Sequence, residues 1–342
     1  MNNMKKRFIY ELNAFYREPM CIIGYEFGAG EHTVCVVGSM RGNENQQLFT
    51  CSQLIQRLKQ LEEQAALTEG KSILVIPCLN SYSINIGKRF WSTDNTDINR
   101  MFPGYAEGET TQRIAAGVFE RIKDYQYGIQ LASNYMEGDF LPHIRMMRTG
   151  FEDVETAKGF AFPYIVTRNP HPYDTTTLNY NWQIWGTKAF SVYTTTTETI
   201  DRESADKAVK GIERMLNREK ILNSEVLGGD NAHTQVISDE NLLSVRCKEA
   251  GFYKSGVSVG EEVHKGQILA VITDPYEGFI KEELVSDSDG IVFFQHKSPL
   301  IYAGTAVIKL VRYDSDYKRL SNSGTIGWQI ASTTFPVNGL DK

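Results

Sequence analysis

The chain has 342 residues, of which 41% are hydrophobic and 23% are charged, and its formal net charge at pH 7 is −6. This composition is ordinary for a globular protein, and the length favours two domains. The acidic balance gives no general attraction to nucleic acid or to an anionic membrane surface, so we expect neither partner. Charged residues interrupt the apolar stretches, so neither a membrane span nor a cleavable signal peptide is expected.

The five cysteines are scattered along the chain and form no Cys-x-x-Cys pair. Two of them, Cys35 and Cys78, lie within apolar runs that are typical of strands. We therefore expect reduced, buried thiols in a cytoplasmic protein. A nucleophilic cysteine is the alternative, but no histidine partner lies close to one in the sequence.

Through the first two-thirds of the chain, apolar runs typical of strands alternate with amphipathic segments typical of helices. The predicted strands are 33–37, 72–77, 127–132, 161–167 and 189–195, and the predicted helices are 46–64, 111–124 and 204–217. This alternation predicts a layered α/β domain whose central sheet is mostly parallel or mixed and is flanked by helices. Ligands bind at the carboxyl ends of the strands in such sheets. Four polar residues follow predicted strand ends: Glu44, Asn80, Ser133 and Glu198.

The pattern changes after residue 222, where a glycine-rich segment indicates a linker or turn. Short strand-like runs separated by glycine turns follow at 243–247, 251–254, 267–272, 280–285, 290–294 and 306–311. They predict a small all-β barrel or sandwich. We thus expect domains at 1–225 and 235–312. The tail at 313–342 has no predicted placement, although Trp328 and Phe335 could pack it against the first domain.

A long segment without a clear period covers residues 80–104, and long loops in compact domains are usually functional. It contains Arg89 and the pair Asn99-Arg100. An arginine beside an amide is suited to a substrate carboxylate, because the guanidinium group can bind both oxygens. The alternative is a loop held by internal ion pairs, from Asp94 or Asp97 to one of these arginines.

The end of this segment, Asp97-Ile-Asn-Arg-Met-Phe-Pro-Gly104, resembles the Asp-x-Asn-Arg-x-Phe-Pro-Gly signature of the succinylglutamate desuccinylase/aspartoacylase family. The resemblance runs from about Thr33 to Val311. It includes the loop Gly38-Ser-Met-Arg-Gly-Asn-Glu44, the segment Leu141-Pro-His-Ile-Arg145 and the pair Thr197-Glu198. It implies a carboxypeptidase-like fold and descent from zinc-dependent hydrolases that cleave the amide bond of N-acyl amino acids.

The same resemblance implies roles for individual residues. Asn99 and Arg100 would hold the carboxylate of an N-acyl amino acid, and Asn80 would lie in the same substrate site. Arg89 would stabilise the oxyanion of the tetrahedral intermediate. Glu198 would be the general base that takes a proton from zinc-bound water.

The zinc ligands of the family would be a loop histidine, the loop glutamate, and a histidine at the end of strand 127–132. In this chain Glu44 is retained, but Arg41 and Ala132 stand at the two histidine positions. Neither residue can coordinate a metal, and catalytic zinc needs three protein ligands. We therefore expect no conventional zinc site, and we expect the guanidinium of Arg41 to occupy the vacated region and to pair with Glu44, Glu198 or both. The alternative is that Arg41 faces solvent.

The C-terminal β segment resembles a lipoyl or biotinyl domain through residues 259–272 and 288–292. Carrier domains present a modified lysine at a tight hairpin, whereas the corresponding turn here, Ser286-Asp-Ser-Asp-Gly290, has none. We therefore expect a lipoyl-like domain without a carrier function. In relatives of this kind it would shield the pocket or support an oligomer interface.

Three functions follow. The first is a zinc-free relative, without a cofactor, that binds a small carboxylate-bearing ligand or a partner and does not hydrolyse it. The second is an active amidohydrolase with a rearranged metal site that uses Glu44, Asn134 or His143, with zinc as its cofactor. The third is metal-independent acid–base chemistry by Glu198, assisted by Arg41 or Arg89. No motif identifies the ligand, and a homo-oligomer is the default expectation.

Overall fold

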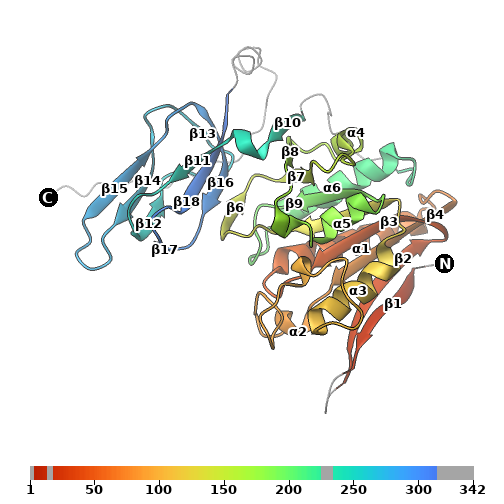
Figure 1. The fold of residues 1–342 in the computed structure, drawn as a ribbon. Helices are drawn as coiled ribbons and strands as arrows, with labels where there is room; N and C mark the ends of the chain where they lie inside the picture. Colours follow the sequence, from red (N-terminus) through yellow and green to blue (C-terminus); the bar gives the residue numbers. More distant parts are fainter. Residues whose placement is uncertain (1–3, 14–17, 225–233, 314–342) are drawn as a thin grey trace, which may run out of the picture. The chain divides into compact units, whose positions relative to one another are not determined.

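The computed structural model describes residues 4–13, 18–224 and 234–313, and the chain divides into two compact units, Met1–Asn241 and Leu242–Lys342 (Figure 1). The division falls later than the expected linker. Strand β10 (Gln235–Ser238), expected in the second domain, pairs in parallel with β8 (Tyr164–Arg168) of the first unit. The expectations for Trp328 and Phe335 lie outside the described residues.

The first unit is built on a mixed sheet of nine strands in the order β1-β2-β4-β3-β5-β9-β7-β8-β10. Besides β8 and β10, its strands are β1 (Lys5–Leu12), β2 (Met20–Gly28), β3 (Gly30–Ser39), β4 (Gly70–Cys78), β5 (Tyr127–Ala132), β7 (His143–Met147) and β9 (Lys188–Tyr193). A short strand, β6 (Gly138–Phe140), precedes β7. Five of the pairings are parallel and three are antiparallel, namely β1 with β2, β2 with β4 and β7 with β9. The predicted α/β class with a mixed, flanked sheet is confirmed.

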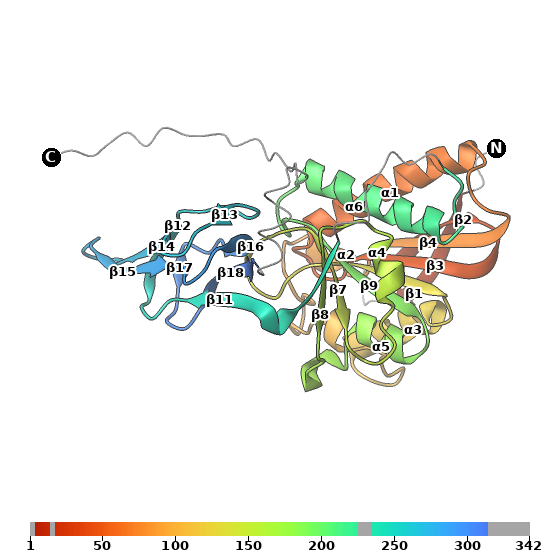
Figure 2. The same cartoon turned by 90° about the horizontal axis from the view of Figure 1, so that it is seen from above.

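Helices cover both faces of this sheet. The long ones are α1 (Asn45–Glu63), α3 (Thr110–Ile122) and α6 (Arg202–Arg218), and the short ones are α2 (Ser81–Ile84), α4 (Val154–Lys158) and α5 (Leu178–Ile184). Short 3-10 turns lie at Ile98–Arg100, Pro172–Asp174 and Asp239–Asn241. Helices α1 and α6 lie on one face, and α3 and α5 lie on the other (Figure 2). None of the helices in the described ranges is long and apolar enough to cross a membrane.

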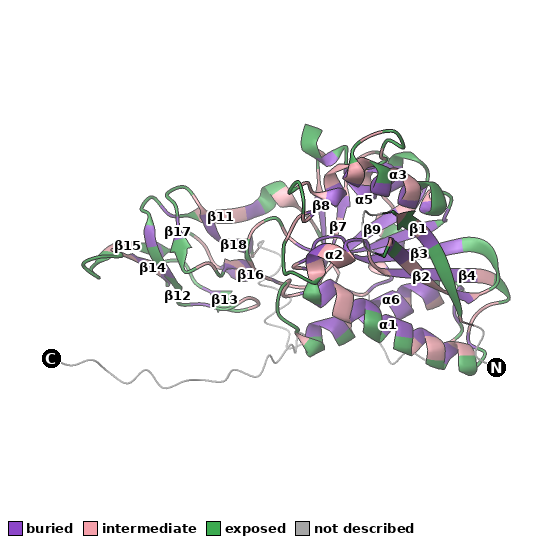
Figure 3. Cartoon of the chain, turned by 90° about the horizontal axis from the view of Figure 1, so that it is seen from below, coloured by how far each residue is buried: buried purple, intermediate pink, exposed green. Residues whose placement is uncertain are grey.

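Helix α1 shows why these segments fold as predicted. Its apolar residues Leu54, Leu58 and Leu61 recur at helical spacing and are buried against the sheet, together with Val34 and Val75. The opposite side of the helix is exposed, as Figure 3 shows for both α1 and α6. An apolar stripe of this kind is the pattern that drives helix packing onto a sheet.

The parallel strands end at one edge of the sheet. Strands β3, β4, β5 and β9 run in the same direction, so the residues after Ser39, Cys78, Ala132 and Tyr193 come together there. Strand β7 runs antiparallel to β9 and begins at the same edge with His143. This is the edge at which ligand sites of α/β proteins form.

The second unit is all-β, as predicted, and its strands pair antiparallel. One sheet has the order β15-β14-β12-β17, and the strands of the other follow the order β11-β18-β16-β13. These strands are β11 (Leu242–Arg246), β12 (Gly251–Ser255), β13 (Glu262–Val263), β14 (Ile268–Thr273), β15 (Ile280–Val285), β16 (Gly290–His296), β17 (Leu300–Ile301) and β18 (Ala306–Arg312). Alternate residues of both sheets, such as Tyr253, Ile272 and Leu310, form its core.

Candidate functional site

The loop after β3 packs closely against the loop that follows β4, the neighbouring strand. The backbone N–H of Gly42 donates to the carbonyl oxygen of Arg89 at 3.0 Å. A Cβ atom at position 42 would lie 2.1 Å from the carbonyl oxygen of Lys88 and 2.5 Å from that of Ser83. Only glycine permits this approach, which fixes the path of the chain into α1.

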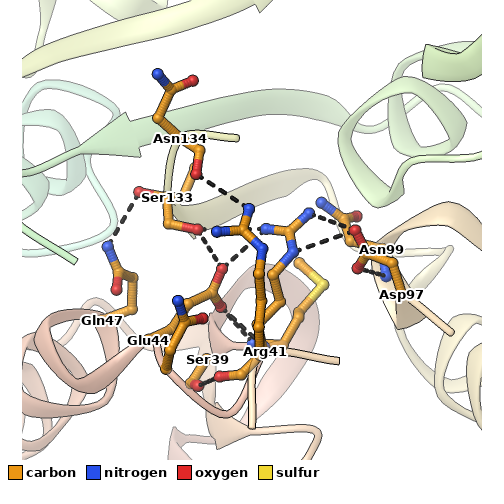
Figure 4. Close-up of polar contacts among 12 residues, drawn as sticks. Ser39, Arg41, Glu44, Gln47, Asp97, Asn99, Ser133 and Asn134 are labelled. Atoms are coloured by element: carbon orange, nitrogen blue, oxygen red, sulfur yellow. Dashed lines mark hydrogen bonds and ion pairs between the residues drawn. The ribbon is translucent and has the colours of Figure 1, made fainter. Parts of the chain in front are cut away.

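Glu44 is buried, and hydrogen bonds occupy both of its carboxylate oxygens (Figure 4). Oε2 accepts from the backbone N–H of Met40 at 2.7 Å and of Arg41 at 3.1 Å. Oε1 accepts from Nη1 of Arg41 at 2.9 Å and from the hydroxyl of Ser133. The carboxylate also immediately precedes α1, where the helix dipole favours a negative charge. Four donors therefore saturate this group.

Arg41 lies between two carboxylates and is only 5% exposed. Besides Glu44, its guanidinium binds Oδ2 of Asp97, through Nη2 at 2.8 Å and Nε at 3.2 Å. Nη1 also donates to the Ser133 hydroxyl at 3.3 Å. Burial by itself lowers the pKa of Arg41, but the charges of Glu44 and Asp97 outweigh it and hold the pKa above its ordinary value. The group is a permanent, buried cation.

The prediction that Arg41 pairs with Glu44, Glu198 or both is confirmed for Glu44. The second partner of Arg41 is Asp97, and the ion pairs of the described residues include none to Glu198. Glu198 is exposed, and its Oε1 accepts from Nδ2 of Asn43 at 2.9 Å. The backbone of Glu198 is held by the first residue of α1, because Nδ2 of Asn45 donates to the Glu198 carbonyl oxygen at 3.0 Å. Solvent stabilises Glu198, so it needs no buried cation.

The ion pairs proposed as an alternative for the 80–104 loop are also absent from the described part of the chain. Asp97 is used by Arg41, which reaches it from the β3 loop. The Oδ1 atom of Asp94 accepts from the Thr96 backbone N–H at 2.9 Å. Asp97 also caps a 3-10 turn, because its Oδ1 accepts from the backbone N–H of Asn99 at 3.0 Å.

The donor set at these positions does not fit a catalytic zinc ion. Arg41 offers only N–H donors and Ala132 offers none, so neither can coordinate. The oxygens of Glu44 are already engaged by four donors. Gln47 is close, but its Nε2 donates to the carbonyl oxygen of Ala132 at 3.2 Å. Within the described ranges, no three His, Cys, Asp or Glu side chains form a group suited to a metal.

His143 and Asn134, the substitute ligands considered from the sequence, do not join such a group. His143 is fully buried, its Nδ1 lies 2.7 Å from the carbonyl oxygen of Leu141, and its ring stacks on that of Tyr193 with centroids 4.7 Å apart. The backbone carbonyl of Asn134 accepts from Arg89 at 3.3 Å. Both residues lie at the strand-end edge, in structural contacts.

Arg89 differs from Arg41 in its bonding. It is half-buried, and its Nη2 donates to the Asn134 carbonyl. This is the one hydrogen bond that its guanidinium makes within the described part of the chain. Its Cζ lies 5.4 Å from the ring centroid of Phe90. Burial lowers the pKa of Arg89, and the nearby charge of Arg41 lowers it further. A cation in this position gains from an additional anionic or polar partner.

The remaining predicted substrate residues are placed by short turns. Residues 97–104, which carry the family signature, are called the signature loop. Oδ1 of Asn99 accepts from the backbone N–H of Leu178 at 3.0 Å, which connects this loop to α5. Nη1 of Arg100 donates to the Asn99 carbonyl at 2.8 Å. Asn80 caps α2 by accepting from Ser83 at 3.2 Å, and its buried Nδ2 has no partner among the described residues. A buried donor of this kind costs about 1–3 kcal/mol unless something binds it.

Arg41, Glu44, Asp97 and Ser133 form one bonded group, the Arg41 cluster. The roles of Asp97 and Ser133 in it were not predicted. Asp97 opens the Asp-x-Asn-Arg signature, and this conspicuous position was the available signal. Its pairing with Arg41 joins residues 56 positions apart, so local pattern could not show it. Ser133 was noted only as a residue beyond a strand end, and its contact with Glu44 follows from the pairing of β3 with β5.

Together, a flanked mixed sheet and a polar cluster at its strand ends define a layered α/β protein of the kind that binds small molecules at that edge. Residues 31–218, more than half of the chain, match the family described as the succinylglutamate desuccinylase/aspartoacylase catalytic domain. The chain belongs to this family.

Three proteins illustrate what this chain is similar to. The N-alpha-acetyl-L-2,4-diaminobutyric acid deacetylase of Halomonas elongata is 21% identical over 277 residues, which cover 76% of each chain. A succinylglutamate desuccinylase/aspartoacylase structure from Rhodobacter sphaeroides has a TM-score of 0.72 at 20% identity, covering 89% of this chain and 95% of the other. The product-bound ectoine utilization protein EutE (DoeB) from Ruegeria pomeroyi has a TM-score of 0.72 at 19% identity, with 90% and 94% covered. These similarities show the shared fold.

Proposed function

We propose that this protein is a zinc-free member of its family that binds a small carboxylate ligand, of the N-acyl amino acid class, without conventional hydrolysis. The position of Arg41 carries the proposal. Its guanidinium is buried against Glu44 and Asp97, in the loop where the family's zinc ligands are expected. A zinc ion there would have to displace a buried cation from two carboxylates and would recover one ligand.

The ligand-binding side of the proposal rests on groups that the Arg41 cluster does not use. Arg100 and Asn99 lie in the signature loop, where they would hold the carboxylate. Arg89 would take a second oxygen of the ligand, such as the acyl carbonyl. The unpartnered Nδ2 of Asn80 supports a ligand oxygen near the end of β4. The Halomonas relative, named as a deacetylase of N-acetyl-diaminobutyric acid, supports the N-acyl amino acid class.

The same geometry argues against conventional hydrolysis. Amide cleavage in this family would require an activated water and a base beside it. Glu44 already accepts four hydrogen bonds, so its oxygens are not free to hold and orient a water molecule. Glu198 is exposed and bonded to Asn43, so its proposed role as base would require it to leave that contact.

Calorimetric titration would test this function. The full chain, treated with a chelator, would be titrated with a panel of N-acetyl amino acids that includes N-acetyl-diaminobutyric acid and N-acetyl-aspartate. Saturable binding is expected, and it should be lost in Arg100→Ala but kept in Lys210→Ala, a matched change on the exposed side of α6. Free amine would be measured in the same samples and should not accumulate.

Two outcomes would reject the proposal. Binding that is unchanged in Arg100→Ala would show that the signature loop does not hold the carboxylate. Steady release of free amine that zinc restores and a chelator removes would establish the alternative, an active amidohydrolase with a rearranged metal site.

A further inference from the structure

One face of the second unit carries an exposed row of large apolar side chains. On the sheet β15-β14-β12-β17, Phe252 pairs with Leu300 on one side and with Thr273 on the other, and Thr273 pairs with Ile280. Paired residues point to the same face of a sheet. Phe252, Ile280 and Leu300 are 44%, 55% and 56% exposed. The row therefore crosses all four strands on the side away from the core.

The opposite face of the same sheet already forms the core of this unit. Tyr253, Ala270, Ile272 and Leu284 alternate with the exposed residues and are buried there. An antiparallel sheet with one face on the core normally presents polar residues on the other. Here Phe252, Ile280 and Leu300 make one row of the outer face apolar. An exposed apolar row of this kind is a candidate interaction surface.

A second row on this face carries two opposite charges that are not paired with each other. Lys254 pairs across the sheet with Val271, and Val271 pairs with Glu283. Both charged residues are exposed, and in the described chain neither belongs to an ion pair. They lie on β12 and β15, on either side of the central strand β14, about 9–10 Å apart at the usual strand spacing.

We propose that this face binds a second copy of the same chain, face to face. The two-fold axis would lie between the two sheets, parallel to β14. Such an axis exchanges the β12 and β15 sides of the sheet. It would place Lys254 of one copy against Glu283 of its partner, and Phe252 against Ile280. Val271 and Thr273, the smaller residues of the central strand, would meet their own copies on the axis. The charge arrangement is thus complementary to itself, as a two-fold interface requires.

Sedimentation velocity of the full chain would test this arrangement. The wild type is expected to be a dimer, and Lys254→Glu and Glu283→Lys are each expected to weaken dimerisation at least about tenfold, because each sets like charges opposite one another. An equimolar mixture of these two variants should dimerise again, since both cross-copy contacts then join opposite charges. Lys210→Glu, on α6 in the first unit, is the matched control and should leave the dimer intact.

The mixing experiment distinguishes this interface from others. A wild-type monomer at micromolar concentration would overturn the proposal. A dimer that survives Phe252→Asp and both charge reversals would place the contact elsewhere and would also overturn it. Variants that unfold would be recognised by circular dichroism, and recovery of the dimer on mixing two folded monomeric variants cannot arise from misfolding.

Discussion

Two arginine-bearing regions of the first unit differ in how completely their guanidinium groups are bonded. Arg41 makes hydrogen bonds to Glu44, Asp97 and Ser133 and is buried. Arg89 and Arg100 lie on the neighbouring loop, are partly exposed, and in the described residues bond mainly to backbone carbonyls, of Asn134 and Asn99. One region is closed by the protein itself, and the other keeps donors for a partner.

The difference separates structural charge from binding charge. A buried cation whose three nitrogens are all hydrogen-bonded stabilises the connections among the elements that carry its acceptors, here the ends of β3 and β5 and the signature loop. A half-buried cation with unused donors is more stable when an anion arrives. On this view, the Arg41 cluster takes over the cross-linking role of a metal, while the signature loop still serves a ligand.

The largest expected effect is on stability. Arg41→Ala leaves Glu44 and Asp97 without their cation, and breaking a buried pair in this way costs about 3–5 kcal/mol. Urea unfolding followed by circular dichroism would measure the loss. Arg89→Ala, the matched control, should cost less than about 1 kcal/mol. If the two variants lost equal stability, the distinction between the two regions would be wrong.

The next effect is on ligand affinity. Arg100→Ala removes a charge-assisted hydrogen bond, worth about 1.5–3 kcal/mol, so affinity for an N-acyl amino acid should fall roughly 10- to 100-fold. Its stability should stay near that of the wild type, because Arg100 is not part of the Arg41 cluster. Calorimetric titration measures the first quantity and urea unfolding the second. A stability loss as large as that of Arg41→Ala would contradict this division of roles.

The smallest effect concerns the thiol below the cluster. Burial raises the pKa of Cys78 to about 12, and the charge of Glu44 contributes to the rise. The folded thiol therefore stays protonated, whereas an unfolded one ionises near pH 8.5. Its contribution to the free energy of unfolding is complete below about pH 8.5 and is lost as the pH rises towards 12.

Thiol labelling followed by mass spectrometry would check this difference. At pH 8, exposed Cys21 should react with iodoacetamide well before Cys78, Cys35 and Cys51. Equal labelling rates at Cys21 and Cys78 would show that the strand-end edge is open to solvent, and the cluster would then not be closed.

The sequence predicted the parts of the fold that repeat an apolar pattern. Helix α1 and strands β3, β4 and β5 follow such patterns, and each was predicted to within a few residues. The hairpin of β1 and β2 was not predicted, because β1 reads KKRFIYEL and is mostly exposed at the edge of the sheet. An edge strand has no buried face on each side to impose an apolar run.

The candidate site was predicted less completely, for a different reason. The pairing of Arg41 with Glu44 is local, three residues apart, and was predicted from charge and from the place of both residues in the family's zinc loop. Asp97 and Ser133 reach Arg41 through long-range strand order, which residue spacing does not encode. The contacts of Glu198 were not predicted, because they are made by Asn43 and Asn45, two amides whose positions depend on the start of α1.

Metal content tests the central claim most directly. The full chain would be purified without chelators, incubated with excess zinc, desalted and analysed by mass spectrometry for metals, beside an Arg41→His/Ala132→His double variant. With Arg41 bonded to Glu44 and Asp97, we predict well under one zinc per wild-type chain, and about one per chain in the variant, where two histidines join Glu44. One tightly held zinc per wild-type chain would contradict the account.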